Sequence, residues 1–231
     1  MTSREIYLWP IKSLIDHTLD FNNSNDESNS FIKNELDEVK EDLIFISNLL
    51  FKNYLLTTTG GNISSRVGNK VVITPSGASN ALLWHLAPKD LVVLDLEGRV
   101  LDGGNPSIET PVHIALYSKI PEVNAIIHAH TSLLSAFANL GRGITENLFI
   151  REATLRNIPI LPIAKSGKEL AEIVCEALKN VEFKTKFGKL YLLESHGVLS
   201  IGKNLRQAYS TLDLGNQMAL RKIIEKLLEK K

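Results

Sequence analysis

Residues 123–131 read Val-Asn-Ala-Ile-Ile-His-Ala-His-Thr, an apolar stretch that ends in two histidines. Such a run predicts a buried strand, in which alternate side chains face the same way. His128 and His130 therefore project from one face, at a spacing that lets both imidazoles reach one metal ion. The same spacing also occurs in partly buried histidines that only make hydrogen bonds. These two residues alone leave both interpretations open.

A third histidine lies in a comparable setting further along the chain. Two apolar runs, Leu190–Leu193 and Val198–Ile201, predict strands on either side of the turn Glu194-Ser195-His196-Gly197. This places His196 at the end of a sheet. Three neutral imidazoles with an open fourth position form a catalytic zinc site, because a substrate oxygen can bind there. His17 and His85 have no such setting and are predicted on the surface.

The rest of the chain alternates helical patterns with short apolar runs. Helices are predicted from about Phe31 to Tyr54, from a cap at Ser107 through Ile120, after the capping box Ser166-x-x-Glu169, and from a cap at Asn204 to the C-terminal region, interrupted only at Gly215. Further strands are predicted over residues 63–66, 71–74, 91–96 and 99–101, paired around Gly68-Asn69 and Glu97-Gly98. Helices that alternate with antiparallel hairpins indicate a sheet layered with helices.

Two glycine-containing loops are candidates for binding an anion. They are Thr59-Gly60-Gly61-Asn62 and Thr74-Pro75-Ser76-Gly77. Glycine allows successive backbone N–H groups to turn inward together, and such concavities hold phosphate oxygens. Taken separately, each loop also reads as an ordinary turn. Neither matches a nucleotide-binding fingerprint.

Glu109 and His113 are four residues apart at the start of a predicted helix, so they share a face. A helix N-terminus favours the carboxylate form of Glu109. Glu109 could therefore help to cap the helix, or it could transfer protons beside the metal. The spacing does not choose between these roles.

Composition describes an ordinary globular protein and sets limits on its partners. The 231 residues fit one generous domain, and 26 basic and 26 acidic side chains cancel. This balance offers no field that would gather nucleic acid or a membrane. The single cysteine, Cys175, is predicted in a helix core, and a cytoplasmic location is expected. The polar stretch 21–30 predicts a linker, so residues 1–30 form an N-terminal extension and 31–231 the catalytic domain.

In order along the chain, five motifs resemble the class II aldolase and adducin head-domain family. They are Thr-Gly-Gly-Asn-Ile-Ser from Thr59, Ile-Thr-Pro-Ser-Gly from Ile73, Pro-Ser-Ile-Glu-Thr-Pro-Val-His from Pro106, His-Ala-His-Thr from His128 and Glu-Ser-His-Gly-Val from Glu194. The resemblance runs from about residue 31 to the end of the last helix. It implies an α/β fold with three α/β/α layers around a largely antiparallel sheet. It also implies a homotetramer whose active sites lie between subunits.

The resemblance also implies roles for individual residues. The zinc ligands, one ion per chain, would be His128, His130 and His196. Glu109 matches the carboxylate that moves the proton at the carbon next to the carbonyl. Positions that contact the substrate phosphate are matched by Gly61, Asn62, Ser76, Gly77 and Ser107, with Thr59 nearby. The implied reaction is the reversible cleavage of a short ketose 1-phosphate to dihydroxyacetone phosphate and an aldehyde, as in fuculose-phosphate aldolases.

Departures from the family pattern keep other reactions open. Many members carry two serines before the acid, whereas Ile108 stands at the second position. The tyrosines that aldolases use are absent, because Asn147-Leu148-Phe149 occupies one region and the chain ends at Lys231. Glu152 lies where epimerases and dehydratases place a second acid/base. Alternatives are therefore a sugar-phosphate 4-epimerase, dehydratase or decarboxylase, or a non-catalytic adducin-like scaffold.

Overall fold

A computed structural model describes residues 26–145, 157–164, 167–183 and 186–229. The chain divides into two compact units, Met1–Asn34 and Glu35–Lys231. The described part of the first unit is helical and belongs to α1 (Asp26–Lys52), which begins inside the stretch predicted as a linker. The extension predicted over residues 1–30 lies mostly outside the described residues and stays a prediction. His17 lies there too.

The second unit is built on one eight-stranded sheet with the order β4-β3-β2-β1-β5-β10-β9-β8. Its strands are β1 (Asn62–Val67), β2 (Lys70–Ile73), β3 (Val92–Asp95), β4 (Val100–Asp102), β5 (Ala125–Ala129), β8 (Ile160–Leu161), β9 (Lys189–Leu193) and β10 (Gly197–Gly202). Every neighbouring pair is antiparallel except β8 and β9, which run parallel. The predicted largely antiparallel sheet is confirmed.

The hairpins follow the turns that the sequence predicted. Strands β1 and β2 pair from Ser64 with Ile73 to Val67 with Lys70, around Gly68 at φ 54°. Strands β3 and β4 turn at Gly98, where φ is 83°. Glycine favours both turns because a positive φ strains residues that carry a Cβ.

Side chains that alternate along the central strands bury against two separate layers. In β5, Ile126 packs with one apolar cluster and Ile127 with the other, and both are fully buried. Adjacent residues Val71 and Val72 in β2 divide in the same way. A strand with apolar residues on both faces needs a cover on each side. The sheet is therefore the middle of three layers.

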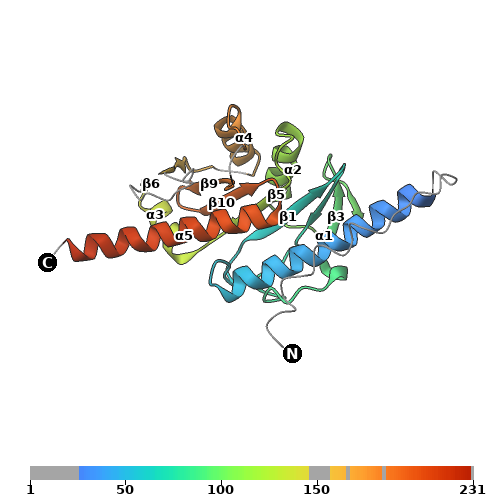
Figure 1. The fold of residues 1–231 in the computed structure, drawn as a ribbon, viewed down its shortest axis with the longest axis horizontal. Coiled ribbons are helices and arrows are strands. Elements are labelled where there is room, and N and C mark those ends of the chain that lie inside the picture. The colour runs from blue at the N-terminus through green and yellow to red at the C-terminus, as the bar shows by residue number, and fades with distance from the viewer. Residues whose placement is uncertain (1–25, 146–156, 165–166, 184–185, 230–231) are drawn as a thin grey trace. The chain divides into compact units, whose positions relative to one another are not determined.

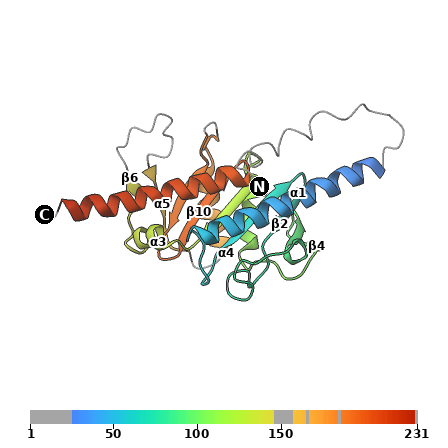
Figure 2. The ribbon, with the colours of Figure 1, turned by 60° about the horizontal axis from the view of Figure 1, so that its bottom comes forward.

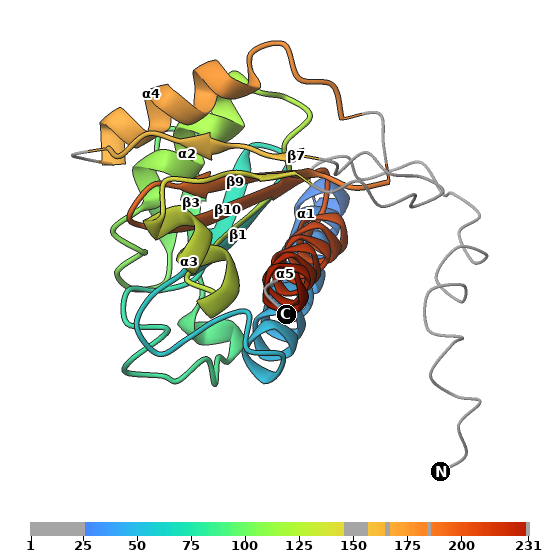
Figure 3. The ribbon, with the colours of Figure 1, turned by 90° about the vertical axis from the view of Figure 1, so that its left-hand side faces the viewer.

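Helices supply both covers (Figures 1 and 3). On one face lie α2 (Thr110–Lys119) and α4 (Gly167–Leu178), whose buried residues share a cluster with Val71 and Ile126. On the other lie α3 (Ser132–Asn139), α5 (Leu205–Leu228) and the part of α1 from Glu35 onward. Figure 2 shows α5 and this later part of α1 along that face. The predicted α/β/α class is confirmed.

Three features differ from the predicted elements. Helix α5 continues through Gly215, because the missing side chain admits Leu190; a Cβ there would stand 2.1 Å from its Cδ2 atom. Helix α3 begins directly after its Thr131 cap, in a stretch for which no element was predicted. The short strands β6 (Ile144–Thr145), β7 (Asn157–Ile158) and β8 were not predicted, since two residues carry no alternation.

The cap predicted for α5 is confirmed, because the Asn204 side chain accepts a hydrogen bond from the Gln207 backbone N–H at 2.8 Å. Cys175 is buried in α4, as predicted, and burial raises the pKa of its thiol. No helix in the described ranges combines the length and the apolar character that crossing a membrane requires.

Candidate active site

Three strand ends meet at one edge of the sheet and bring the candidate residues together. The register pairs Asn62, the first residue of β1, with His128 near the end of β5. Val198, near the start of β10, pairs with Ala129. Because both pairs are antiparallel, strands β1 and β10 begin where β5 ends. Residues far apart in the sequence therefore surround the end of β5.

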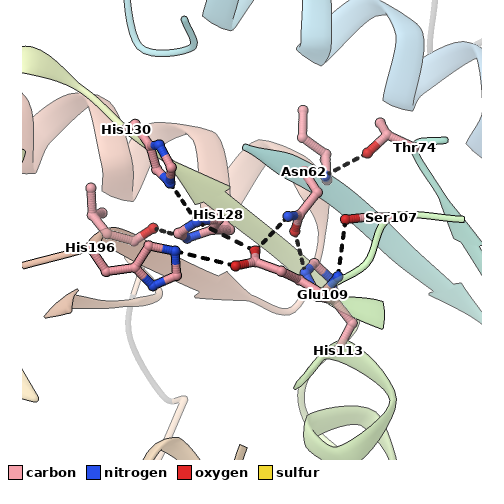
Figure 4. A network of polar contacts seen from close by, with 10 residues as sticks. Asn62, Thr74, Ser107, Glu109, His113, His128, His130 and His196 are labelled. Carbon is pink, nitrogen blue, oxygen red and sulfur yellow. Dashed lines mark hydrogen bonds and ion pairs between the residues drawn. The ribbon is translucent and has the colours of Figure 1, made fainter. Parts of the chain in front are cut away.

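The three predicted histidines converge at this edge (Figure 4). His128 lies in β5, His130 follows its last residue, and His196 occupies the turn before β10. One ligand nitrogen from each lies within 4.8 Å of the other two. The nearest pair is Nε2 of His128 and Nε2 of His130, which are 2.9 Å apart. The structure thus assembles the three imidazoles that the sequence singled out.

Glycine makes room for these rings. A Cβ on Gly60 would stand 2.7 Å from the His130 ring. A Cβ on Gly197 would stand 2.7 Å from the same ring and 2.7 Å from the Ala129 carbonyl oxygen. These distances are shorter than real Cβ contacts allow. Both glycines therefore help to position His130, a role that sequence reasoning did not assign.

The backbone orients the His128 ring. Its Nδ1 donates to the Val198 carbonyl oxygen at 3.1 Å, so the proton of the neutral ring is on Nδ1. Burial lowers the pKa of His128 to about 3, and the carboxylate of Glu109 only partly offsets this. Burial also lowers the pKa of His130. The His128 ring is therefore neutral at pH 7, with a lone pair on Nε2.

Glu109 reaches the histidines from the start of α2. It is the N-cap residue of that helix, with φ −89° and ψ 5°. The preceding loop is held by the Ser107 N–H, which donates to the Thr74 carbonyl oxygen at 3.2 Å. Ser107 was predicted to cap the helix, but the helix begins at Thr110. Its hydroxyl instead accepts from the Glu109 N–H at 3.3 Å.

The two carboxylate oxygens of Glu109 face different partners. Oε1 lies 3.3 Å from Nε2 of His196, and Oε2 lies 3.4 Å from Nε2 of His128. The Asn62 amide donates to Oε2 at 2.6 Å. Burial raises the pKa of Glu109, but the hydrogen bonds from His196 and from the Asn62 amide outweigh it. Its pKa therefore lies well below the usual range.

This donor set fits a divalent cation. The lone pair on Nε2 of His128 points at a second imidazole nitrogen and lies 3.4 Å from an ionised carboxylate oxygen. A cation placed between these atoms could bind all of them at once. Imidazole nitrogens and a carboxylate oxygen are ligands typical of zinc and similar divalent ions. The residues that would hold the ion are His128, His130 and His196, with Glu109 beside it.

A cavity of about 300 Å³ opens onto this group. All ten predicted site residues line it: Thr59, Gly61, Asn62, Ser76, Gly77, Ser107, Glu109, His128, His130 and His196. Gly61 and Gly77 have φ of 109° and 82°, which glycine adopts without strain. The two predicted loops thus form the wall that faces the histidines.

Sequence reasoning missed part of this wall. Ser79 and Asn80 extend the second loop into the cavity and add polar side chains. Ile108 also lines the cavity and is 87% exposed, so an apolar side chain stands beside the polar ones. A search for polar residues just after Gly77 would have found the first two. His85 is exposed, as predicted, while Glu152 and Asn147-Leu148-Phe149 lie outside the described residues.

His113 does not face the three converging histidines. It lies behind Asn62, fully buried, with Nε2 2.6 Å from the Asn62 Oδ1 atom. Glu109 and His113 thus contact opposite ends of the same amide (Figure 4). The spacing predicted a shared direction, but it could not reveal the strand residue between them.

Comparisons with known proteins agree with this geometry. The family model "Class II Aldolase and Adducin N-terminal domain" matches residues 41–219. An L-fuculose phosphate aldolase of Methanococcus maripaludis is 30% identical over 179 residues, 76% of this chain and 91% of that protein. A 3-oxo-tetronate 4-phosphate decarboxylase of Haemophilus influenzae is 32% identical over 175 residues, 73% of this chain and 79% of that protein.

A solved structure shows the same fold. The L-fuculose-1-phosphate aldolase from Thermus thermophilus superposes with a TM-score of 0.69 at 26% sequence identity. The match covers 83% of this chain and 96% of that one.

Proposed function

The chain belongs to the class II aldolase and adducin N-terminal domain family, and we propose that it cleaves a short ketose 1-phosphate reversibly to dihydroxyacetone phosphate and an aldehyde. Family membership and its aldolase relatives make the chain a metal-dependent lyase. The substrate, the metal and the assembly are the proposed part.

One observation carries the proposal. Three imidazoles and the carboxylate of Glu109 converge on one side of a cavity, and two glycine loops with hydroxyl side chains form its other wall. The first group suits a carbonyl with an adjacent hydroxyl, and the second suits a phosphate. A sugar phosphate that spans both would place its reacting carbons beside Glu109.

The loops would hold the substrate by its phosphate. Thr59, Ser76 and Ser107 supply hydroxyl donors, and the turns at Gly61 and Gly77 bring backbone close to the cavity. Binding energy from this remote group fixes the reacting carbons in place. Ile108 offers no hydrogen bond where a second serine would.

Glu109 would move the proton. In the condensation direction, its ionised carboxylate removes a proton from the hydroxymethyl carbon of dihydroxyacetone phosphate, and in cleavage it returns that proton to the same carbon. Its low pKa keeps it ionised at neutral pH. The hydrogen bond from Asn62 holds one carboxylate oxygen in place.

We propose zinc as the ion, one per chain. When bound, it would act as a Lewis acid for the substrate oxygens and stabilise the negative charge that develops there. Three histidines are the ligand set of one well-known group of catalytic zinc sites. Another divalent ion with similar preferences would serve the same chemistry.

Decarboxylation is a second candidate, because the Haemophilus relative is a 3-oxo-tetronate 4-phosphate decarboxylase. That substrate also carries a ketone, an adjacent hydroxyl and a phosphate. Loss of carbon dioxide leaves an electron pair on the hydroxyl-bearing carbon, as loss of an aldehyde does, and a proton completes dihydroxyacetone phosphate. Glu109 would take up a proton from water and deliver it to this carbon. This reaction needs no group to protonate an aldehyde oxygen.

Epimerisation or dehydration would require a second acid/base, for which Glu152 is the candidate. We prefer the cleavage reaction because this chain has Glu109 at the position where epimerases have an aspartate. An adducin-like scaffold is disfavoured, since a scaffold has no need to keep three converging imidazoles.

The deciding experiment assays the purified, metal-loaded protein against ketose 1-phosphates, including L-fuculose 1-phosphate, and against 3-oxo-tetronate 4-phosphate. A coupled reductase detects dihydroxyacetone phosphate, and trapping of aldehyde or of carbon dioxide identifies the other product. Aldehyde release supports the proposal. Carbon dioxide release would replace it with the decarboxylase, and interconversion of pentulose 5-phosphate epimers without triose phosphate would replace it with an epimerase.

We also propose a cytoplasmic homotetramer with active sites between subunits, as the resemblance implies. The cavity opens at a sheet edge, where a neighbouring subunit could complete it. Sedimentation equilibrium of the metal-loaded protein tests the assembly, and a monomer with full activity would contradict it.

A further inference from the structure

A line of buried polar side chains runs from Glu109 into the interior beneath α2. Asn62 links the Glu109 carboxylate to His113, and Ser64 links His113 to the Tyr117 hydroxyl. Each of these four contacts is 2.6 Å long. The four residues behind Glu109 are buried, with exposed fractions from 0% to 3%.

The contacts admit one direction of hydrogen bonding. An ionised carboxylate accepts only, so Asn62 turns its NH₂ group toward Glu109 and its oxygen toward His113. The oxygen needs a donor, so Nε2 of His113 carries the ring proton. Burial holds the pKa of His113 near 4, so the ring is neutral and carries one proton. Its Nδ1 atom therefore accepts from the Ser64 hydroxyl.

The hydrogen bonds at the Tyr117 end of the line agree with this direction. Ser64 donates its only hydroxyl proton to His113, so its oxygen accepts from the Tyr117 O–H. The aromatic ring of Tyr117 is buried beneath α2 and fixes the hydroxyl there. All four hydrogen bonds thus run in the same direction, with the donor on the Tyr117 side and the acceptor on the Glu109 side.

We propose that His113 is a positioning residue that sets the orientation of the Asn62 amide. The two orientations of an asparagine amide fill nearly the same space, so packing alone does not distinguish them. The reversed one would place the amide oxygen 2.6 Å from a Glu109 oxygen, two acceptors in contact.

The consequence for the reaction rests on the function proposed above for Glu109. With its N–H donor, Asn62 holds the carboxylate between His128 and His196. Without it, Glu109 can rotate away from the position where it meets the substrate carbon. Loss of the His113 donor should therefore lower kcat more than it weakens metal binding.

The test compares two substitutions of similar size. In His113→Gln, the side-chain NH₂ can occupy the position of Nε2 and still donate to Asn62, whereas His113→Leu removes the donor. With both proteins metal-loaded, we expect kcat to fall by about tenfold to a hundredfold in His113→Leu, a part of the loss typical for a proton-transfer group, and by only a few-fold in His113→Gln. Metal content should be unchanged in both. Equal losses in the two variants would assign His113 a packing role only.

A control separates positioning from loss of stability. Thr211→Val removes two hydrogen bonds that involve no residue of the site, one with the Gly188 N–H and one with the Gln207 carbonyl oxygen. It should lower the melting temperature as His113→Leu does, while kcat stays near wild type. If Thr211→Val lost as much activity at equal melting temperature, instability would explain the effect and the inference would be wrong.

A readout independent of activity tests the same point. Long-range ¹H–¹⁵N correlation spectra of the imidazoles, recorded with and without zinc, report which nitrogen of His113 is protonated. We expect the Nε2–H form in both, and the Nδ1–H form would overturn the inference. If the wild-type protein cleaved none of the substrates, the proposed function would fail, whereas the His113 tautomer would still decide the orientation of Asn62.

Discussion

Glu109 keeps its charge in a position where its side chain is only 21% exposed, because His196 and the Asn62 amide contact its two oxygens. A carboxylate so placed is available as a base at neutral pH without first losing a proton. The same contacts fix both oxygens, so the group that we propose transfers the proton is also held in one place. The strand partner Asn62 therefore matters to the chemistry as much as the helix that carries Glu109.

Glu109→Gln tests the role of this carboxylate. The amide has nearly the same shape but cannot accept a proton, so turnover should fall by about a hundredfold to ten-thousandfold. The three imidazoles remain, and metal content should stay near one ion per chain. Activity and metal analysis on the same preparation check both points. Near-normal turnover with the ion bound would leave Glu109 a structural role at the start of α2.

His128→Ala tests the metal site, and His85→Ala is its control because His85 is exposed and outside the cavity. Loss of a direct ligand should weaken metal binding by more than about a hundredfold, the upper end for residues that only support a ligand. Metal analysis after dialysis, with circular dichroism to check folding, measures the effect. Full metal content in folded His128→Ala would remove this residue from the site.

The candidate site residues could be predicted from the sequence because each lies in a short motif. The His-x-His pair needs only strand alternation, and the loops need only glycine beside hydroxyl residues. The line through Asn62, His113 and Ser64 could not be predicted. It joins residues of β1 to residues of α2, and which atoms meet depends on how that helix packs on the strand.

Among the secondary-structure elements, β10 limits the space around the histidine rings through its first residue, Gly197. Gly197 lies against the end of β5, between the Ala129 carbonyl and the rings of His130 and His128. The backbone oxygen cannot move without disturbing the pairing of β5 and β10. A side chain here would therefore displace the histidine rings.

Gly197→Ala should show this in metal affinity. Overpacking of this kind costs about 1–3 kcal/mol of stability, and misplaced ligands weaken metal binding by about tenfold to a hundredfold. Gly104→Ala is the matched control, since a Cβ on Gly104 meets no atom within 4 Å. Isothermal titration with zinc compares the two. Equal zinc affinities for both variants would show that the strand ends are not packed as described.

Elements were predictable where an apolar pattern ran long enough to show a period. The hairpins β1–β2 and β3–β4 and the helices α2, α4 and α5 are of this kind. Helix α3 was missed because its apolar residues continue directly from β5, and one run can be read as either structure. The predicted interruption at Gly215 was wrong because the close approach of Leu190 is a tertiary contact, which the sequence alone does not show.

At the scale of the whole catalytic unit, the three layers decide which groups lose contact with water. His128 lies in β5, while His113 lies in α2 against Asn62 and Ser64 of β1, and neither retains more than 2% exposure. A buried imidazole resists protonation, because the charged form loses its hydration. Burial accordingly lowers the pKa of His113 to about 4 and that of His128 to about 3. The fold should therefore be sensitive to acid.

The sign of this effect follows from the shift of His113. In the unfolded chain its pKa is near 6.5, so between about pH 6.5 and about pH 4 the unfolded state binds a proton that the folded state refuses. This group therefore does not reduce the free energy of unfolding above about pH 6.5. It reduces it progressively as the pH drops, and the reduction reaches its limit below about pH 4. From about pH 7.5 to about pH 5, protonation of His113 in the unfolded chain alone should lower the free energy of unfolding by about 2 kcal/mol.

His113→Gln removes the titrating group and keeps the hydrogen bond to Asn62. The free energy of unfolding of the metal-free variant should therefore fall by about 2 kcal/mol less than that of wild type over this interval. Urea unfolding of both proteins at the two pH values, with a chelator present, measures the difference. Identical losses would mean that His113 is protonated in the folded state, and the hydrogen-bond direction from Tyr117 to Glu109 would then be wrong as well.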